Sequence, residues 1–154
     1  MALETEPVPL RSDAPKRRSP GSALALTALA DVAVILAFVL MGRNSHEERL
    51  SPASVLGVAA PFLIAAALSW AALVLWHRSN GGEAATAALP SLRLVWPDGV
   101  TVWLGTAVLG LVLRGLVFGD GTAASFVIVT GAVLGVGLVG WRVAVGVRSN
   151  RAGS

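Results

Sequence analysis

Residues 22–42 read SALALTALADVAVILAFVLMG, an apolar run whose one charged side chain is Asp31. A helix needs roughly 20 residues to cross about 30 Å of hydrocarbon, so this run is long enough to span a membrane. Three further runs of sufficient length follow it, at residues 52–76, 100–118 and 122–145. Unpaired backbone groups are costly in lipid, and the alternating ten-residue segments of a membrane β-barrel are absent. The sequence therefore predicts four transmembrane helices.

The composition supports a membrane protein rather than a soluble domain. Hydrophobic residues make up 55% of the 154-residue chain and charged residues 14%, and the mean hydropathy is +0.72. Such a chain has too little polar surface to be a soluble domain. We expect an all-α fold, a compact bundle of four transmembrane helices spanning residues 22–147. A disordered basic tail is predicted at residues 1–21, and a short tail at residues 148–154.

Basic residues are distributed unevenly between the two sides of the predicted topology. Nine would lie on the side of the termini and of the loop between the second and third helices, and three on the opposite side. The nine are Arg11, Lys16, Arg17, Arg18, Arg78, Arg93, Arg142, Arg148 and Arg151, and the three are Arg43, Arg49 and Arg114. Because cytoplasmic loops carry an excess of Lys and Arg, we predict a multi-pass plasma membrane protein with both termini in the cytoplasm.

Two helices carry an ion inside the predicted hydrocarbon. Asp31 shares a helical face with Phe38 and Gly42, and Arg114 shares one with Gly110. Lipid-facing surfaces seldom carry ions, so both faces should turn toward other helices. Counted from residues 22 and 100, Asp31 lies about 13 Å and Arg114 about 21 Å from the cytoplasmic side. An arginine could bridge much of this offset, so Arg114 either pairs with Asp31 or extends outward toward Asp120 or headgroups.

Other polar residues near helix ends have two interpretations each. Arg43 and Arg142 are expected to anchor helix ends at lipid headgroups, although a phosphate-bearing ligand could use them. His46 follows the first helix, where it either makes interfacial hydrogen bonds or acts as a pH-responsive gate. Asp31 either locks two helices together or handles a proton or ligand.

Several small or ring-bearing residues are predicted to shape helix packing. Gly131 and Gly135 match the spacing of small residues at close helix contacts, either within the bundle or between subunits. Pro61 removes one backbone hydrogen bond inside the second helix and should kink or loosen it between Val58 and Phe62.

The sequence contains few of the residue types that catalysis or metal binding requires. It has no cysteine and two histidines, His46 and His77, which lie far apart in the chain. We find no nucleophile paired with a base, no paired carboxylates and no metal-ligand spacing. We therefore expect no enzymatic activity, no catalytic residues, no metal, no cofactor and no nucleic-acid partner.

The pattern of polar, aromatic and glycine residues along the chain resembles that of the bacterial and archaeal membrane proteins grouped as domain of unknown function 3054. The resemblance covers residues 24–147, and its most specific element is the Gly-Arg-x-Ser-His ending of the first helix. The residues that carry it are Asp31, Phe38, Gly42, Arg43, Ser45, His46, Pro61, Phe62, Trp70, Trp103, Thr106, Gly110, Arg114, Phe126, Val127, Gly140, Trp141 and Arg142. It implies a compact four-helix membrane protein and no particular activity.

Two classes of function remain open. In the first, the chain is a structural or accessory membrane subunit, in which buried polar residues fix helix packing and the partner is another membrane protein. In the second, it is a small transporter or ion-coupled protein using Asp31 and Arg114. Because four helices alone make a poor pathway, the second class predicts a homo-oligomer.

Overall fold

A computed structural model describes residues 20–44, 51–81, 95–117, 119 and 123–152. Its elements are α1 (Pro20–Asn44), α2 (Pro52–Gly81), the short kinked segment η2 (Val95–Gly99), α4 (Val100–Leu116) and α5 (Ala124–Ala152). Four helical segments are long and apolar enough to cross a membrane: Leu24–Gly42, Pro52–Asn80, Val95–Leu116 and Ala124–Arg148. The predicted all-α fold with four membrane-spanning helices is therefore confirmed.

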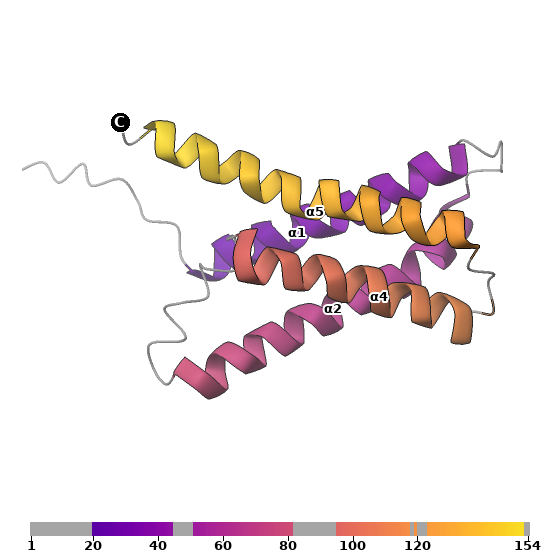
Figure 1. The fold of residues 1–154 in the computed structure, drawn as a ribbon, viewed down its shortest axis with the longest axis horizontal. Coiled ribbons are helices and arrows are strands. Elements are labelled where there is room, and N and C mark those ends of the chain that lie inside the picture. The colour runs from indigo at the N-terminus through magenta and orange to yellow at the C-terminus, as the bar shows by residue number, and fades with distance from the viewer. Residues whose placement is uncertain (1–19, 45–50, 82–94, 118, 120–122, 153–154) are drawn as a thin grey trace, which may run out of the picture.

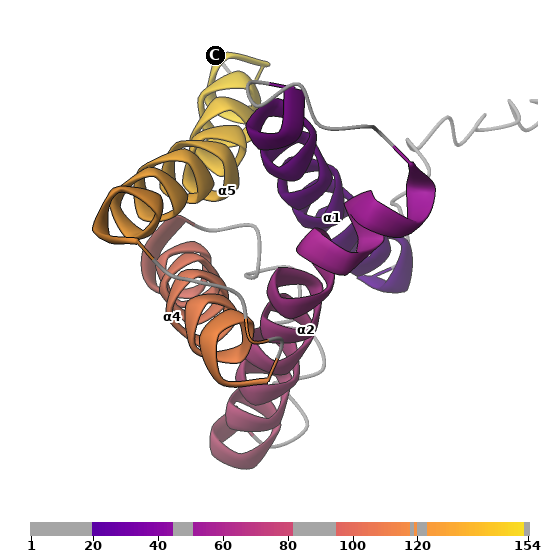
Figure 2. The same ribbon diagram turned by 90° about the vertical axis from the view of Figure 1, so that its right-hand side faces the viewer.

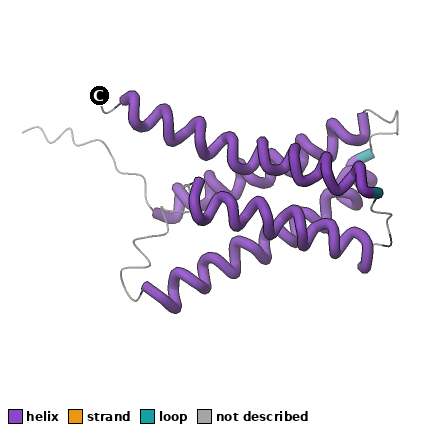
Figure 3. The backbone as a smooth tube through the Cα atoms, viewed as in Figure 1, coloured by secondary structure: helices purple, strands orange, loops and turns teal. Residues whose placement is uncertain are grey.

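The four long helices run alternately up and down around a common centre (Figures 1 and 2). α1 begins and α5 ends at the same end of the bundle, which we call the terminal end (Figure 1). The last turns of α2 and the start of α4 also lie there (Figure 1). Every regular element in the described part of the chain is helical (Figure 3).

Two helices extend beyond their apolar runs. α2 continues to Gly81, and α5 continues through Arg148 to Ala152. α5 therefore extends past the predicted membrane span at residues 122–145 and into the predicted tail at residues 148–154. Arginine has a high helix propensity and is favourable near a helix C-terminus, so a charged residue ends the apolar run without ending the helix. The predicted basic tail falls on residues 1–21, of which 1–19 lie outside the described residues.

The core of the bundle is aliphatic and aromatic. Phe38 of α1 and Phe62 of α2 meet edge to face with their ring centroids 5.6 Å apart, a favourable aromatic geometry. Phe126 of α5 lies 6.4 Å from Phe38 and 6.5 Å from Phe62. Ile35 and Leu134 are completely buried in the same cluster. Residues far apart in the sequence thus form one core across three helices.

α2 bends along its length. Its first turns run at an angle to the remainder of the helix (Figure 2), and Pro61 lies inside the helix. A proline in a helix interior removes a backbone hydrogen bond and clashes with the preceding turn, which explains the bend.

Two glycines allow close approach between helices. A Cβ atom on Gly110 would collide with the ring of Phe62, so α4 approaches α2 closely at this point. A Cβ on Gly135 would lie 2.9 Å from the Trp103 ring, and the Gly131 carbonyl accepts a 2.9 Å hydrogen bond from the Trp103 indole. Gly135 therefore packs within the bundle, against Trp103 of α4, whereas a Cβ on Gly131 would meet nothing within 4 Å.

Gly42 does not take part in such a contact. It is exposed near the end of α1, and a Cβ added there would meet nothing within 4 Å. Its predicted place on a packing face is therefore wrong, whereas Ile35 and Phe38 of the same face are buried. The buried face of α1 ends at Phe38 and Val39, and Gly42 lies beyond it.

Candidate functional site: a buried ion pair with two tryptophans

The polar centre of the bundle is a salt bridge between Asp31 of α1 and Arg142 of α5. Arg142 donates from Nη1 to Asp31 Oδ1 at 2.7 Å and from Nη2 to Oδ2 at 2.8 Å. Both residues are 1% exposed. Such a parallel two-bond arrangement is the strongest geometry for a guanidinium and a carboxylate. Each ion thus meets the requirement for a partner that burial imposes.

Two indole rings complete the hydrogen bonding of the carboxylate. The Trp70 indole of α2 donates to Asp31 Oδ2 at 3.0 Å, and the Trp141 indole of α5 donates to Oδ1 at 2.9 Å. A carboxylate offers about four acceptor positions, and four N–H groups fill them here. Asp31 therefore joins three helices, α1, α2 and α5, through one side chain.

Arg142 is held on its own helix as well. Its Nη1 donates to the Leu138 carbonyl at 2.7 Å, and its guanidinium carbon lies 4.6 Å from the centre of the Trp141 ring. A cation over an aromatic face is attracted by the ring, most strongly by tryptophan. Trp141 thus supports both ions, one with its indole N–H and the other with its face.

The four side chains meet because their helices place them at one level. Asp31 follows Pro20 by eleven residues, and Trp70 precedes Gly81 by eleven. Trp141 and Arg142 precede Ala152 by eleven and ten residues. At about 1.5 Å per residue, each lies about 15–17 Å along its helix from the terminal end. This common depth lies well inside the membrane-spanning segments.

The expected role of Arg142 at the lipid headgroups is corrected by this geometry. That expectation rests on the apolar run of the fourth helix, which ends at residue 145. Side chains on a helix point back toward its N-terminus, so the Arg142 side chain extends into the bundle from a backbone position that is itself deeper than expected. This direction of helical side chains is the feature of the sequence that could have placed Arg142 inside the bundle.

Arg114, the other proposed partner of Asp31, lies elsewhere. Its guanidinium carbon is 4.8 Å from the centre of the Phe126 ring, near the end of α4 away from the terminal end. The carboxylate of Asp31 is bonded to Arg142 instead, so the predicted Asp31–Arg114 pair is not formed. The alternative contact of Arg114 with Asp120 involves a residue outside the described part of the chain.

A second polar contact lies at the terminal end. His77 Nε2 of α2 is 3.2 Å from Asp98 Oδ1 in η2, and the Asp98 side chain is buried. This contact ties the end of α2 to the start of α4, and sequence reasoning did not identify it. Two other predicted site residues cannot be placed: His46 and the side chain of Arg43 lie outside the described part of the chain.

The chemistry of the Asp31 cluster is that of a fixed ion pair. All four acceptor positions of the carboxylate are occupied by protein N–H groups, and the guanidinium is bonded to the carboxylate and a backbone carbonyl. Removing one member of a buried pair leaves an uncompensated charge and costs about 3–5 kcal/mol. The arrangement is therefore suited to holding helices in one register.

Comparison with known proteins identifies the family of the chain. The model of the family described as "Protein of unknown function (DUF3054)" matches residues 28–145. The chain therefore belongs to this family, as the resemblance in its sequence implied. No curated protein and no solved structure matches the chain.

Proposed function

We propose that this member of the family is a structural or accessory membrane subunit, in which the Asp31–Arg142 pair fixes the packing of α1, α2 and α5. The observation that carries the proposal is the saturation of the Asp31 carboxylate by four protein donors. A carboxylate in this state has no free acceptor position for a transported ion or substrate. Its four hydrogen bonds instead stabilise one arrangement of the three helices that carry the donors and the carboxylate.

The transport alternative has less support from the geometry. Arg114 lies nearer than Asp31 to the end of the bundle away from the terminal end, and the buried apolar side chains of Ile35 and Phe62 lie in the core between these levels. A transport route needs polar groups or water along its length. The aromatic cluster of Phe38, Phe62 and Phe126 offers neither.

The proposal includes a place and an orientation. We place the chain in a bacterial plasma membrane with the terminal end in the cytoplasm, without enzymatic activity. The support is the exposed Arg78, Arg148 and Arg151 on the helices at that end, which is the pattern of cytoplasmic residues. We propose another membrane protein as the partner: fixing helix register is the best-attested use of a buried polar pair, and a fixed register gives the partner one defined surface to bind.

The experiment is a rescue assay with a neutral version of the cluster. Asp31→Asn combined with Arg142→Gln removes both charges and keeps side chains that can hydrogen-bond each other and both indoles. In a strain lacking the protein, a structural subunit carrying this double change should restore the wild-type phenotype at matched protein level. It should also elute from mild detergent in a complex of the same mass as wild type.

Single changes supply the contrast. Arg142→Gln alone leaves a buried carboxylate without its cation, so protein level and complex should both fall. A double variant that is abundant and assembled but does not restore the phenotype would contradict the structural proposal, because it would show that the charges themselves are needed. A wild-type chain that elutes as a lone bundle would contradict the accessory role.

A further inference from the structure

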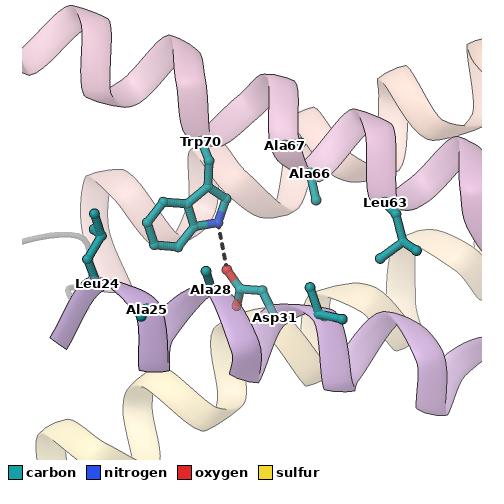
Figure 4. A pocket seen from close by; sticks show the side chains of 9 residues that line it. Leu24, Ala25, Ala28, Asp31, Leu63, Ala66, Ala67 and Trp70 are labelled. Carbon is teal, nitrogen blue, oxygen red and sulfur yellow. Dashed lines mark hydrogen bonds between the residues drawn. The ribbon is translucent and has the colours of Figure 1, made fainter. Parts of the chain in front are cut away.

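A cavity of about 490 Å³ lies between α1 and α2 beside the ion pair. Figure 4 shows Ala28 and Asp31 of α1 facing Trp70 and Ala66 of α2 across it. Apart from Asp31 and Trp70 its walls are aliphatic, and four of its nine lining residues are alanines. Small side chains on two facing helices leave this space open. Its volume and its lining are typical of a site for a small apolar ligand.

The cavity opens toward lipid. Ala25 and Val32 of α1 and Ala67 of α2 line it and are exposed on the surface of the bundle. These residues belong to the membrane-spanning segments Leu24–Gly42 and Pro52–Asn80, so the opening faces hydrocarbon. A ligand would therefore enter sideways from the bilayer.

The cavity reaches close to the terminal end of the bundle. Leu24 lines it and lies four residues from the start of α1, about 6 Å along the helix. Val32 lies eight residues deeper, about 12 Å further into the membrane. The long dimension of the cavity thus follows the direction of a lipid chain that descends from the headgroup region.

A basic residue stands above the opening on α2. Arg78 follows the exposed lining residue Ala67 by eleven residues, which is about three helical turns, so the two lie on one face. Arg78 is itself exposed, in the last turn of α2. Arg148 and Arg151 also lie at this end of the bundle, but on α5, which does not line the cavity. The headgroup region next to the cavity therefore favours an anionic group.

We propose that this cavity binds one hydrocarbon chain of an anionic phospholipid from the leaflet at the terminal end, with the lipid phosphate beside Arg78. Trp70 forms one wall and is held in place by its hydrogen bond to Asp31. The lipid needs no acceptor on Asp31, so the ion pair stays intact when it binds. This site is independent of the structural role proposed above, and its test leaves Asp31 and Arg142 unchanged.

The experiment is a titration of the full chain in mild detergent with phosphatidylglycerol, and separately with phosphatidylcholine, read by native mass spectrometry. We expect one lipid to bind, with phosphatidylglycerol at least fivefold tighter than phosphatidylcholine. Ala67→Phe, at the exposed edge of the cavity, and Ala28→Phe, inside it, should each weaken binding of phosphatidylglycerol at least tenfold. Arg78→Gln should reduce its affinity to that of phosphatidylcholine.

Ala37→Phe and Arg151→Gln are the matched controls. Ala37 is exposed on α1 but does not line the cavity, and Arg151 is exposed at the end of α5. Each should change the affinity less than twofold. Equal binding of the two lipids, or full binding by Ala67→Phe, would overturn the proposal. If Ala28→Phe fails to fold, the exposed positions Ala67 and Arg78 still decide the outcome.

Discussion

At the scale of single residues, Asp31 shows what a carboxylate needs in order to be stable inside a membrane bundle. Its charge is balanced by Arg142, and its remaining acceptor positions are filled by Trp70 and Trp141. Hydrogen bonds to a charged group contribute about 1.5–3 kcal/mol each, about twice the value for neutral pairs. Each donor of the cluster therefore contributes measurably to the free energy of unfolding.

Trp141→Phe tests one of these donors. The change keeps an aromatic ring beside Arg142 and removes the indole N–H that donates to Asp31 Oδ1. We expect the free energy of unfolding in detergent to fall by about 1.5–3 kcal/mol. Trp76→Phe is the control, because Trp76 is 65% exposed, and it should change the value by less than about 0.5 kcal/mol. Equal effects at the two positions would contradict the role given to Trp141.

The sequence allowed part of this cluster to be predicted. An aspartate within an apolar helix must face inward, and Asp31 does. Its partner could not be predicted in the same way. Arg142 lies near the end of the fourth apolar run, a position that favours contact with lipid headgroups. Arg142 and Asp31 are separated by 111 residues, and no local pattern connects them. Only the relative depth of the helices shows that they meet.

At the scale of helices, the existence of four spans follows from the length of the apolar runs, but their ends and their contacts do not. α5 continues to Ala152 because the residues after its apolar run still favour a helix, although they are not apolar enough to lie in lipid. The close contacts depend on which glycine faces a bulky side chain. A Cβ added at Gly110 would meet the Phe62 ring, whereas one added at Gly42 would meet nothing within 4 Å. Helical spacing alone predicts a packing role for both glycines.

Gly110→Ala tests the close approach of α4 to α2. Its new methyl group would collide with the Phe62 ring, and overpacking of this kind costs about 1–3 kcal/mol. Gly131→Ala is the matched control, since a Cβ there meets nothing within 4 Å, and it should cause no loss of stability. Thermal unfolding of the two variants in the same detergent compares them. A Gly110→Ala protein as stable as Gly131→Ala would show that the two helices do not approach this closely.

At the scale of the whole molecule, the up-and-down arrangement places both termini at one end of the bundle and brings the first and last helices together at the ion pair (Figure 1). This closure joins segments from the two ends of the chain. A ring of helices closed by one buried pair has a defined register, which an assembly partner could recognise.

The orientation of this bundle in the membrane is tested by reporter fusions. Fusions at Ser79 and Ser154 should report the cytoplasm, because exposed basic residues gather at the terminal end. A fusion at Glu48, between α1 and α2, should report the opposite side. A periplasmic signal from Ser79 would reverse the orientation and the leaflet of the proposed lipid site.

The most direct test of the structural role is a double-mutant cycle on the free energy of unfolding, with Asp31→Asn, Arg142→Gln and their combination. Each single change should cost about 3–5 kcal/mol, because it leaves a buried charge without its partner. The double change should cost at least about 2 kcal/mol less than the sum of the two. Asp31→Asn with Arg114→Gln is the control pair and should be additive. Additive effects for Asp31 and Arg142 would show that the pair does not hold the helices together.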